Sequence, residues 1–147
     1  MNLLAKIIAT FFGVGYIPLI PATWVSALTT VLVWYLPNGL GYWIAGFSIA
    51  GLWACAPSRV IFNSKDPKQF VMDEVVGMGL TLLWLPKNIP LYIAAFLLFR
   101  VIDIWKPGFI TTIDKQSHPF SILLDDVAAG ILANVILQII VRTVLHL

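Results

Sequence analysis

The chain has 147 residues, of which 60% are hydrophobic and 11% charged, and its formal net charge is +2. Soluble domains usually contain about 45–50% apolar and about 25% charged residues, so this chain has too few polar residues to cover a water-soluble globule. The small net charge disfavours nucleic-acid binding, and the single cysteine excludes an internal disulfide and a cysteine-based zinc site. We therefore expect one membrane-embedded domain over residues 1–147.

Apolar stretches separated by short polar or proline-containing breaks predict the helices. Residues 3–12 predict a short N-terminal helix that lies at the membrane interface. The candidate embedded helices follow at about residues 23–36, 40–58, 70–85, 90–105 and 122–145. A spanning helix needs about 20 apolar residues, so the shorter first and fourth of these would be tilted, partly buried or re-entrant. The expected fold class is an all-α integral membrane bundle of four or five embedded helices.

The acidic residues gather at a few positions of these helices. Of the seven acids in the chain, five lie within or at the ends of apolar stretches: Asp73, Glu74, Asp103, Asp125 and Asp126. A carboxylate near lipid is costly, so it normally faces the bundle interior and has a partner or a function. If the helices alternate across the membrane, all five acids arrive at the same face.

Helix capping is the simplest alternative explanation. Four of the five acids lie at predicted helix N-termini, where they could cap free N–H groups and suit the helix dipole. Asp103 instead lies near a predicted C-terminus, where the dipole disfavours an anion. It therefore needs a cation close by, either Arg100 or a metal ion. Capping does not explain Asp103, nor why the other four acids share its face.

Helical periodicity adds polar or small residues to the same faces. On the last helix the stripe repeats every four residues: Asp126, Gly130, Asn134, Gln138 and Arg142. On the third embedded helix it runs through Asp73, Gly77 and Thr81, with small residues that allow close helix packing. Arg100 and Asp103 are three residues apart and share a face. We expect the three stripes to face one another.

The basic residues predict the side of the membrane. With the same topology, seven of the nine lysines and arginines fall on the side of the acids, and only Lys87 and Arg142 fall opposite. The positive-inside rule then places the acidic site at the cytoplasmic face.

A cluster of carboxylates with few histidines suits a hard cation such as Mg2+, which binds carboxylates, waters and substrate phosphates. The candidate metal ligands are Asp73, Glu74, Asp103, Asp125 and Asp126. Arg100 and Lys106 could neutralise a phosphate, and with Asp103 and Asp126 they form the candidate catalytic set for phosphoryl transfer. A metal-bound water or an aspartate could be the nucleophile. His118 could assist proton transfer or be an ordinary loop residue.

Four elements occur in order over residues 13–130. They are Gly13-Val-Gly15-Tyr16-Ile-Pro18-Leu-Ile-Pro21-Ala-Thr23, Asp73-Glu74-Val-Val-Gly77, Phe99-Arg100-Val-Ile-Asp103-Ile-Trp105-Lys106-Pro107 and Asp125-Asp126-Val-Ala-Ala129-Gly130. Together they resemble the phosphatidylglycerophosphatase A family, with its glycine- and proline-rich opening and its Asp-Glu-x-x-Gly, Phe-Arg-x-x-Asp-x-x-Lys-Pro and Asp-Asp-x-x-Ala-Gly elements. The second and third elements together are quite specific.

The resemblance implies a multi-pass protein of the bacterial inner membrane. It would be an Mg2+-dependent phosphoric monoester hydrolase that converts phosphatidylglycerophosphate to phosphatidylglycerol, the last step of that lipid's synthesis. By motif, the implied site residues are Asp73, Glu74, Arg100, Asp103, Lys106, Asp125 and Asp126. A cytoplasmic site with a hard metal agrees with a substrate made at the inner leaflet.

The opening element departs from the family pattern. Ala22 and Val25 stand where the family usually has glycines. We still expect Thr23 to cap the next helix and to offer its N-terminus to a phosphate, beside Arg100 and Lys106.

Two other functions are compatible with buried acids. In a cation transporter the acids would form an ion path through the bilayer, and in a non-catalytic membrane partner protein they would be caps. The gathering of the acids at one face favours the phosphatase.

Overall fold

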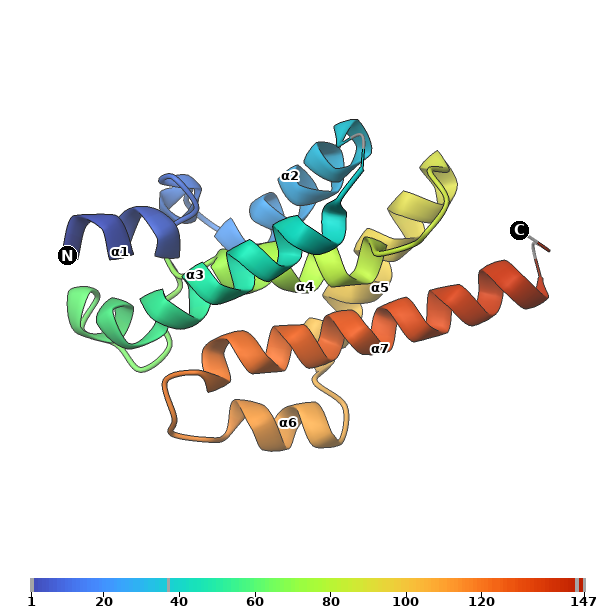
Figure 1. Cartoon of the computed structure of the whole chain (residues 1–147). Coiled ribbons are helices and arrows are strands. Elements are labelled where there is room, and N and C mark those ends of the chain that lie inside the picture. The colour runs from blue at the N-terminus through green and yellow to red at the C-terminus, as the bar shows by residue number, and fades with distance from the viewer. Residues whose placement is uncertain (1, 37, 145, 147) are drawn as a thin grey trace.

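The computed structural model describes residues 2–36, 38–144 and 146, and over these residues the chain is all-helical, without a strand (Figure 1). The elements in chain order are α1 (Asn2–Ala9), the short 3-10 helix η1 (Val14–Tyr16), α2 (Pro21–Tyr35), α3 (Leu40–Ile61), α4 (Met72–Leu82), α5 (Ile89–Trp105), α6 (Phe109–Asp114) and α7 (Ser121–Thr143). The all-α prediction is confirmed.

The predicted helix boundaries lie within about three residues of the observed ones, and two differences have a clear physical reason. The first helix ends at Ala9 and not at residue 12, because Phe11, Phe12 and Gly13 all have positive φ and cannot continue it. The predicted loop 106–121 contains α6, a short helix held in place by its fully buried Ile110. Its six residues are too few to show a helical period. The predicted end of the last helix at residue 145 falls outside the described residues.

Local signals explain where α5 begins and ends. The Asn88 side chain caps its start by accepting a hydrogen bond from the Leu91 N–H at 3.1 Å, and Pro90 follows in the first turn. At its end, Lys106 adopts the left-handed conformation and Pro107 prevents a further turn. The helix therefore stops where Arg100, Asp103 and Lys106 can reach one end of the bundle.

Helix α4 is the buried centre of the bundle, in contact with α2, α3, α5 and α7. Its closest approach is to α7, where a Cβ atom built on Gly130 would lie 2.3 Å from the Gly77 carbonyl oxygen. One turn further along, the Asn134 amide donates hydrogen bonds to the carbonyls of Thr81 and Leu83 at 3.0 and 2.8 Å. The small and polar stripes predicted for these two helices therefore face each other.

Two helices in the described part of the chain, α3 and α7, are long and apolar enough to cross a membrane. Large apolar side chains also lie exposed on the outer surfaces of the bundle, among them Tyr42, Ile104 and Ile139. These features agree with a membrane-associated protein. The number of embedded helices stays a prediction.

Candidate active site

A cavity of about 600 Å³ opens at one end of the bundle and is lined by every residue predicted for the site. These residues come from α2, α4, α5 and α7 and from the segment after α5: Thr23, Asp73, Glu74, Arg100, Asp103, Lys106, Asp125 and Asp126. The alternation of helices brings the acids to one end of the bundle, as the sequence predicts.

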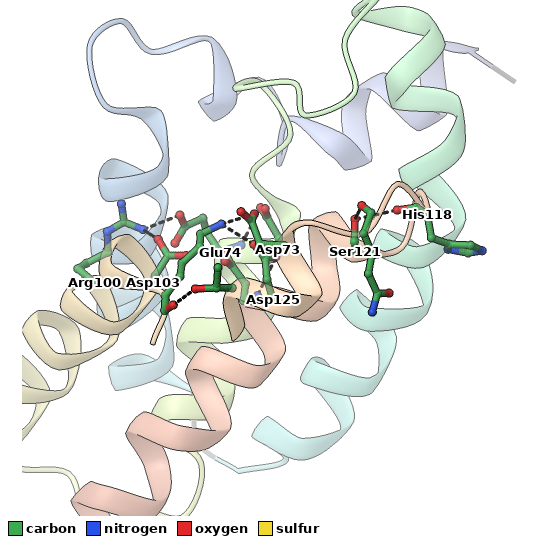
Figure 2. Close-up of polar contacts among 12 residues, drawn as sticks. Asp73, Glu74, Arg100, Asp103, His118, Ser121 and Asp125 are labelled. Atoms are coloured by element: carbon green, nitrogen blue, oxygen red, sulfur yellow. Dashed lines mark hydrogen bonds and ion pairs between the residues drawn. The ribbon is translucent and has the colours of Figure 1, made fainter. Parts of the chain in front are cut away.

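Glu74 is held from two sides by neighbouring helices. The Arg100 guanidinium on α5 lies 2.5 Å from Glu74 Oε1 and 2.6 Å from Asp103 Oδ2, so one arginine joins two acids (Figure 2). Ser26 on α2 donates a buried hydrogen bond of 2.7 Å to the other oxygen, Glu74 Oε2. The Glu74 side chain is only 6% exposed, and a buried carboxylate needs such partners. Its orientation is therefore fixed before any ligand binds.

The cluster of Glu74, Asp103 and Asp126, hereafter the acidic triad, fits a divalent metal ion. Each offers a carboxylate oxygen, and the three oxygens lie within 4.8 Å of one another. Asp126 is 3% exposed, and its Oδ2 atom is buried without a hydrogen-bond partner among the described residues. A buried carboxylate oxygen without a donor is unfavourable, and an oxygen-binding cation supplies the missing positive charge.

Asp73 and Asp125 line the same cavity but lie outside the acidic triad. Asp73 Oδ1 accepts a hydrogen bond from the Glu74 N–H at 2.9 Å, and Asp125 forms an ion pair with Lys106 at 2.7 Å. Their role as metal ligands stays a prediction. Within the described part of the chain, no cation pairs with Asp73.

Lys106 links the cavity to α6. Its ammonium lies 2.7 Å from Asp125 Oδ2 on α7 and 2.5 Å from Asp114 Oδ1 at the end of α6. Burial opposes the charge of Lys106, but the hydrogen bonds to Asp114 and Asp125 outweigh burial and raise the pKa of the ammonium. Partial burial likewise opposes the charge of Asp114, whereas the hydrogen bond from Lys106 lowers its pKa. Lys106 therefore stays charged and carries its positive charge at the cavity wall.

The helix starts contradict the capping alternative for two of its four acids, and they contradict the expected cap of α2. Asp73 and Glu74 lie in the first turn of α4, where Asp73 Oδ1 accepts a hydrogen bond from the Glu74 N–H, so capping fits these two. α7 begins at Ser121, so Asp125 and Asp126 lie in its second turn, where no free N–H groups remain to be capped. α2 begins at Pro21 after Ile20, so Thr23 lies inside the first turn and is not the cap. Thr23 still lines the cavity, beside the N–H groups at the start of α2.

Three contributors to the site are absent from the sequence-based prediction: Ser26, Asp114 and Arg59. In the sequence, the only indication of a role for Ser26 in the site is its position one helical turn after Thr23. Arg59 lines the cavity, and its guanidinium donates hydrogen bonds to the carbonyls of Ser117 and His118 at 2.8 and 3.0 Å. It thereby anchors the loop before α7 to the end of α3.

His118 does not belong to the cavity lining. Its ring packs edge-to-face on Phe120 with centroids 4.7 Å apart, and Nδ1 accepts a hydrogen bond from the Phe120 N–H. Figure 2 shows its side chain pointing away from the carboxylates. The interpretation of His118 as an ordinary loop residue fits this position.

We expect Ser26→Ala to lower the free energy of unfolding by about 1–3 kcal/mol, because it leaves Glu74 Oε2 without its buried donor. Thermal unfolding in detergent measures the change. Ser48→Ala is the matched control, since the Ser48 hydroxyl bonds only the Ile44 carbonyl within its own helix. Equal effects of the two substitutions would show that the contact with Glu74 contributes nothing to stability.

Comparisons with known proteins point to one family. The family model described as "Phosphatidylglycerophosphatase A" matches residues 7–141. A protein of that name from Escherichia coli K12 is 32% identical over 91% of this chain and 81% of its own length, and one from Haemophilus influenzae is 34% identical over 88% and 84%. A candidate phosphatidylinositol-3-phosphatase from Bacteroides thetaiotaomicron is 32% identical over 94% of both chains. No solved structure matches the chain significantly.

Proposed function

This chain belongs to the phosphatidylglycerophosphatase A family, and we propose that it hydrolyses the terminal phosphomonoester of phosphatidylglycerophosphate to give phosphatidylglycerol. The observation that carries this proposal is the acidic triad, which lies in one cavity with Arg100 and Lys106. A phosphoryl group needs positioning and charge stabilisation more than covalent chemistry from the protein. The acidic triad, Arg100 and Lys106 can supply both the positioning and the charge stabilisation.

The acidic triad is the proposed site of Mg2+. The ion would supply positive charge next to the phosphoryl oxygens and hold the substrate in place. Glu74 and Asp103 are prepared for this role by Arg100, which holds one oxygen of each. Asp126 Oδ2 is the ligand atom that the protein leaves without a donor.

The cations of the cavity have separate roles in this proposal. Arg100 orients two of the three ligands, and its Nε–H, buried without an acceptor among the described residues, can donate to a phosphate oxygen. Lys106 offers positive charge from the end of α5, and the start of α2 at Thr23 offers free N–H groups. Asp73, without an ion pair among the described residues, is the carboxylate available to accept a proton from the attacking water. As the water oxygen bonds to phosphorus, the P–O ester bond breaks and Asp73 passes the proton to the ester oxygen. The products are the glycerol hydroxyl and inorganic phosphate.

We also propose that the protein is multi-pass in the cytoplasmic membrane, with four or five embedded helices and the cavity facing the cytoplasm. Lys65, Lys68 and Lys115 lie exposed at the cavity end of the bundle. Lys87 lies at the other end, where its ammonium bonds the carbonyls of Trp34 and Leu36. This distribution supports the cytoplasmic orientation through the positive-inside rule. The cation transporter is not favoured, because the matched family and all three relatives named above are phosphatases by name.

We expect the purified protein to release phosphate from phosphatidylglycerophosphate with Mg2+ and to lose this activity with EDTA. Phosphate release in detergent micelles measures the reaction, and addition of excess Mg2+ after EDTA should restore it. Phosphatidylinositol 3-phosphate is the comparison substrate, because one relative is named for that lipid. If phosphate were released faster from phosphatidylinositol 3-phosphate, the substrate would be assigned to the inositol lipids. Activity unaffected by EDTA would contradict the metal proposal.

A further inference from the structure

One part of the wall of the active-site cavity is apolar. Between the start of α2 and the end of α5 it is formed by Leu19, Ile20 and Ile104, which are 95%, 54% and 72% exposed. Exposed apolar side chains beside a charged cavity are unfavourable in water and favourable against lipid. This side is therefore the one through which an amphiphile can reach the acids without leaving the bilayer.

The same two helices continue into an apolar groove, hereafter the α2–α5 groove. It has a volume of about 390 Å³ and is lined by Ala27, Val31 and Trp34 from α2 and by Ile93 and Phe96 from α5. At its far end the Trp34 ring packs edge-to-face on Tyr92, with centroids 5.4 Å apart. Thr30 and two tyrosines contribute the few polar atoms of the groove.

The groove lies one helical turn from the cavity on both helices. Thr23 of the cavity and Ala27 of the groove are one helical turn apart on α2, and Arg100 and Phe96 are one turn apart on α5. From Thr23 to Trp34 the helix rises about 16 Å at 1.5 Å per residue. That length is about half of the roughly 30 Å hydrocarbon core of a bilayer, which is the depth an acyl chain occupies in one leaflet.

We propose that the α2–α5 groove binds an acyl chain of the substrate lipid, whose headgroup enters the cavity sideways between Leu19 and Ile104. This inference rests on the proposed function and adds the orientation of the lipid. The continuity of a charged cavity with an apolar groove on one helix pair matches the two ends of a phospholipid. A lipid bound in this way is positioned by its tail as well as by its phosphate.

The test uses full-length protein and compares a long-chain with a short-chain form of phosphatidylglycerophosphate. Ala27→Phe fills the groove next to the cavity, and Val31→Trp fills it from its exposed edge, since Val31 is 54% exposed. We expect each to lower kcat/KM for the long-chain lipid about tenfold, the loss expected when contacts of about two methylene groups are displaced. Activity on the short-chain lipid should stay within about twofold of wild type, because a short chain makes few of the methylene contacts that the variants displace.

Ala94→Phe is the matched control, because Ala94 is exposed on α5 outside the groove lining. The groove proposal would be overturned if both groove variants slowed hydrolysis of the two lipids equally, or slowed hydrolysis of neither lipid. A second readout does not need turnover: a long-chain phospholipid with a photoreactive group in its tail should label α2 and α5 at Val31 or Phe96. Labelling elsewhere also counts against the groove. Labelling at these residues by a wild-type protein that hydrolyses neither lipid would refute the proposed function and leave the groove supported.

Discussion

Asp126→Asn is expected to lower phosphate release from phosphatidylglycerophosphate about a thousandfold, the scale of effect seen when one preorganised electrostatic partner of a transition state is removed. Asp126 Oδ2 has no hydrogen-bond donor among the described residues and lies within 4.8 Å of carboxylate oxygens of Glu74 and Asp103. Asparagine keeps the shape of the side chain but removes its negative charge, so the acidic triad loses a metal ligand. Phosphate release at saturating Mg2+ measures the loss.

The same substitution should have the opposite effect on stability without metal. Three buried carboxylates around one point repel one another, so Asp126→Asn should leave the metal-free protein at least as stable as wild type. Mg2+ should stabilise the wild type by about 2.7 kcal/mol at a hundredfold excess over its Kd and should not stabilise the variant. Thermal unfolding with and without Mg2+ measures both effects independently of catalysis.

Asp66→Asn is the control for these measurements. Asp66 is an exposed acid that lines the same cavity, outside the acidic triad. It should keep both the Mg2+-dependent stabilisation and the activity. A folded Asp126→Asn protein that retained wild-type activity would remove Asp126 from the mechanism. If Mg2+ stabilised this variant and the wild type equally, the ion would have to bind elsewhere.

The position of the acids at one end of the bundle could be predicted from the sequence for a topological reason. Asp73 and Glu74 begin one helix, Asp103 ends the next, and Asp126 follows the connection that contains α6. Alternating helices therefore bring them together whatever their exact lengths. Helical periodicity likewise predicted the close contact of α4 and α7, because Gly77 and Gly130 belong to stripes that repeat every four residues.

The composition of the acidic triad could not be predicted, because it depends on how far side chains reach between helices. Arg100 bridges Glu74 and Asp103, whereas Lys106 draws Asp125 toward Asp114 on α6. Helical spacing predicted the pairing of Arg100 with Asp103, but no periodic pattern encodes the contact of Arg100 with Glu74 or those of Lys106. The bond from Ser26 to Glu74 depends on the rotation of α2 about its axis, which its mostly apolar sequence does not define. Helix α6 has six residues, of which Ile110 is buried, and is too short for any pattern.

Gly130→Val is expected to lower the free energy of unfolding by about 3 kcal/mol or more, at the upper end of the cost of overpacking. A Cβ atom at residue 130 would lie 2.3 Å from the Gly77 carbonyl oxygen, and backbone atoms cannot move aside as a flexible side chain can. Helices α4 and α7 must therefore separate. Thermal unfolding of the purified variant in detergent measures the loss.

The same separation should reach the active site. Asp126 precedes Gly130 by one turn of α7, and Glu74 precedes Gly77 by three residues on α4, so moving the helices apart also moves two ligands of the acidic triad apart. A displacement of about 1 Å can cost about a hundredfold in rate, so residual folded protein should show a kcat lowered by that order. Gly46→Val tests the argument, since a Cβ atom at Gly46 meets nothing within 4 Å. If the two glycine variants were equally stable and active, close α4–α7 packing would not be what holds the acids together.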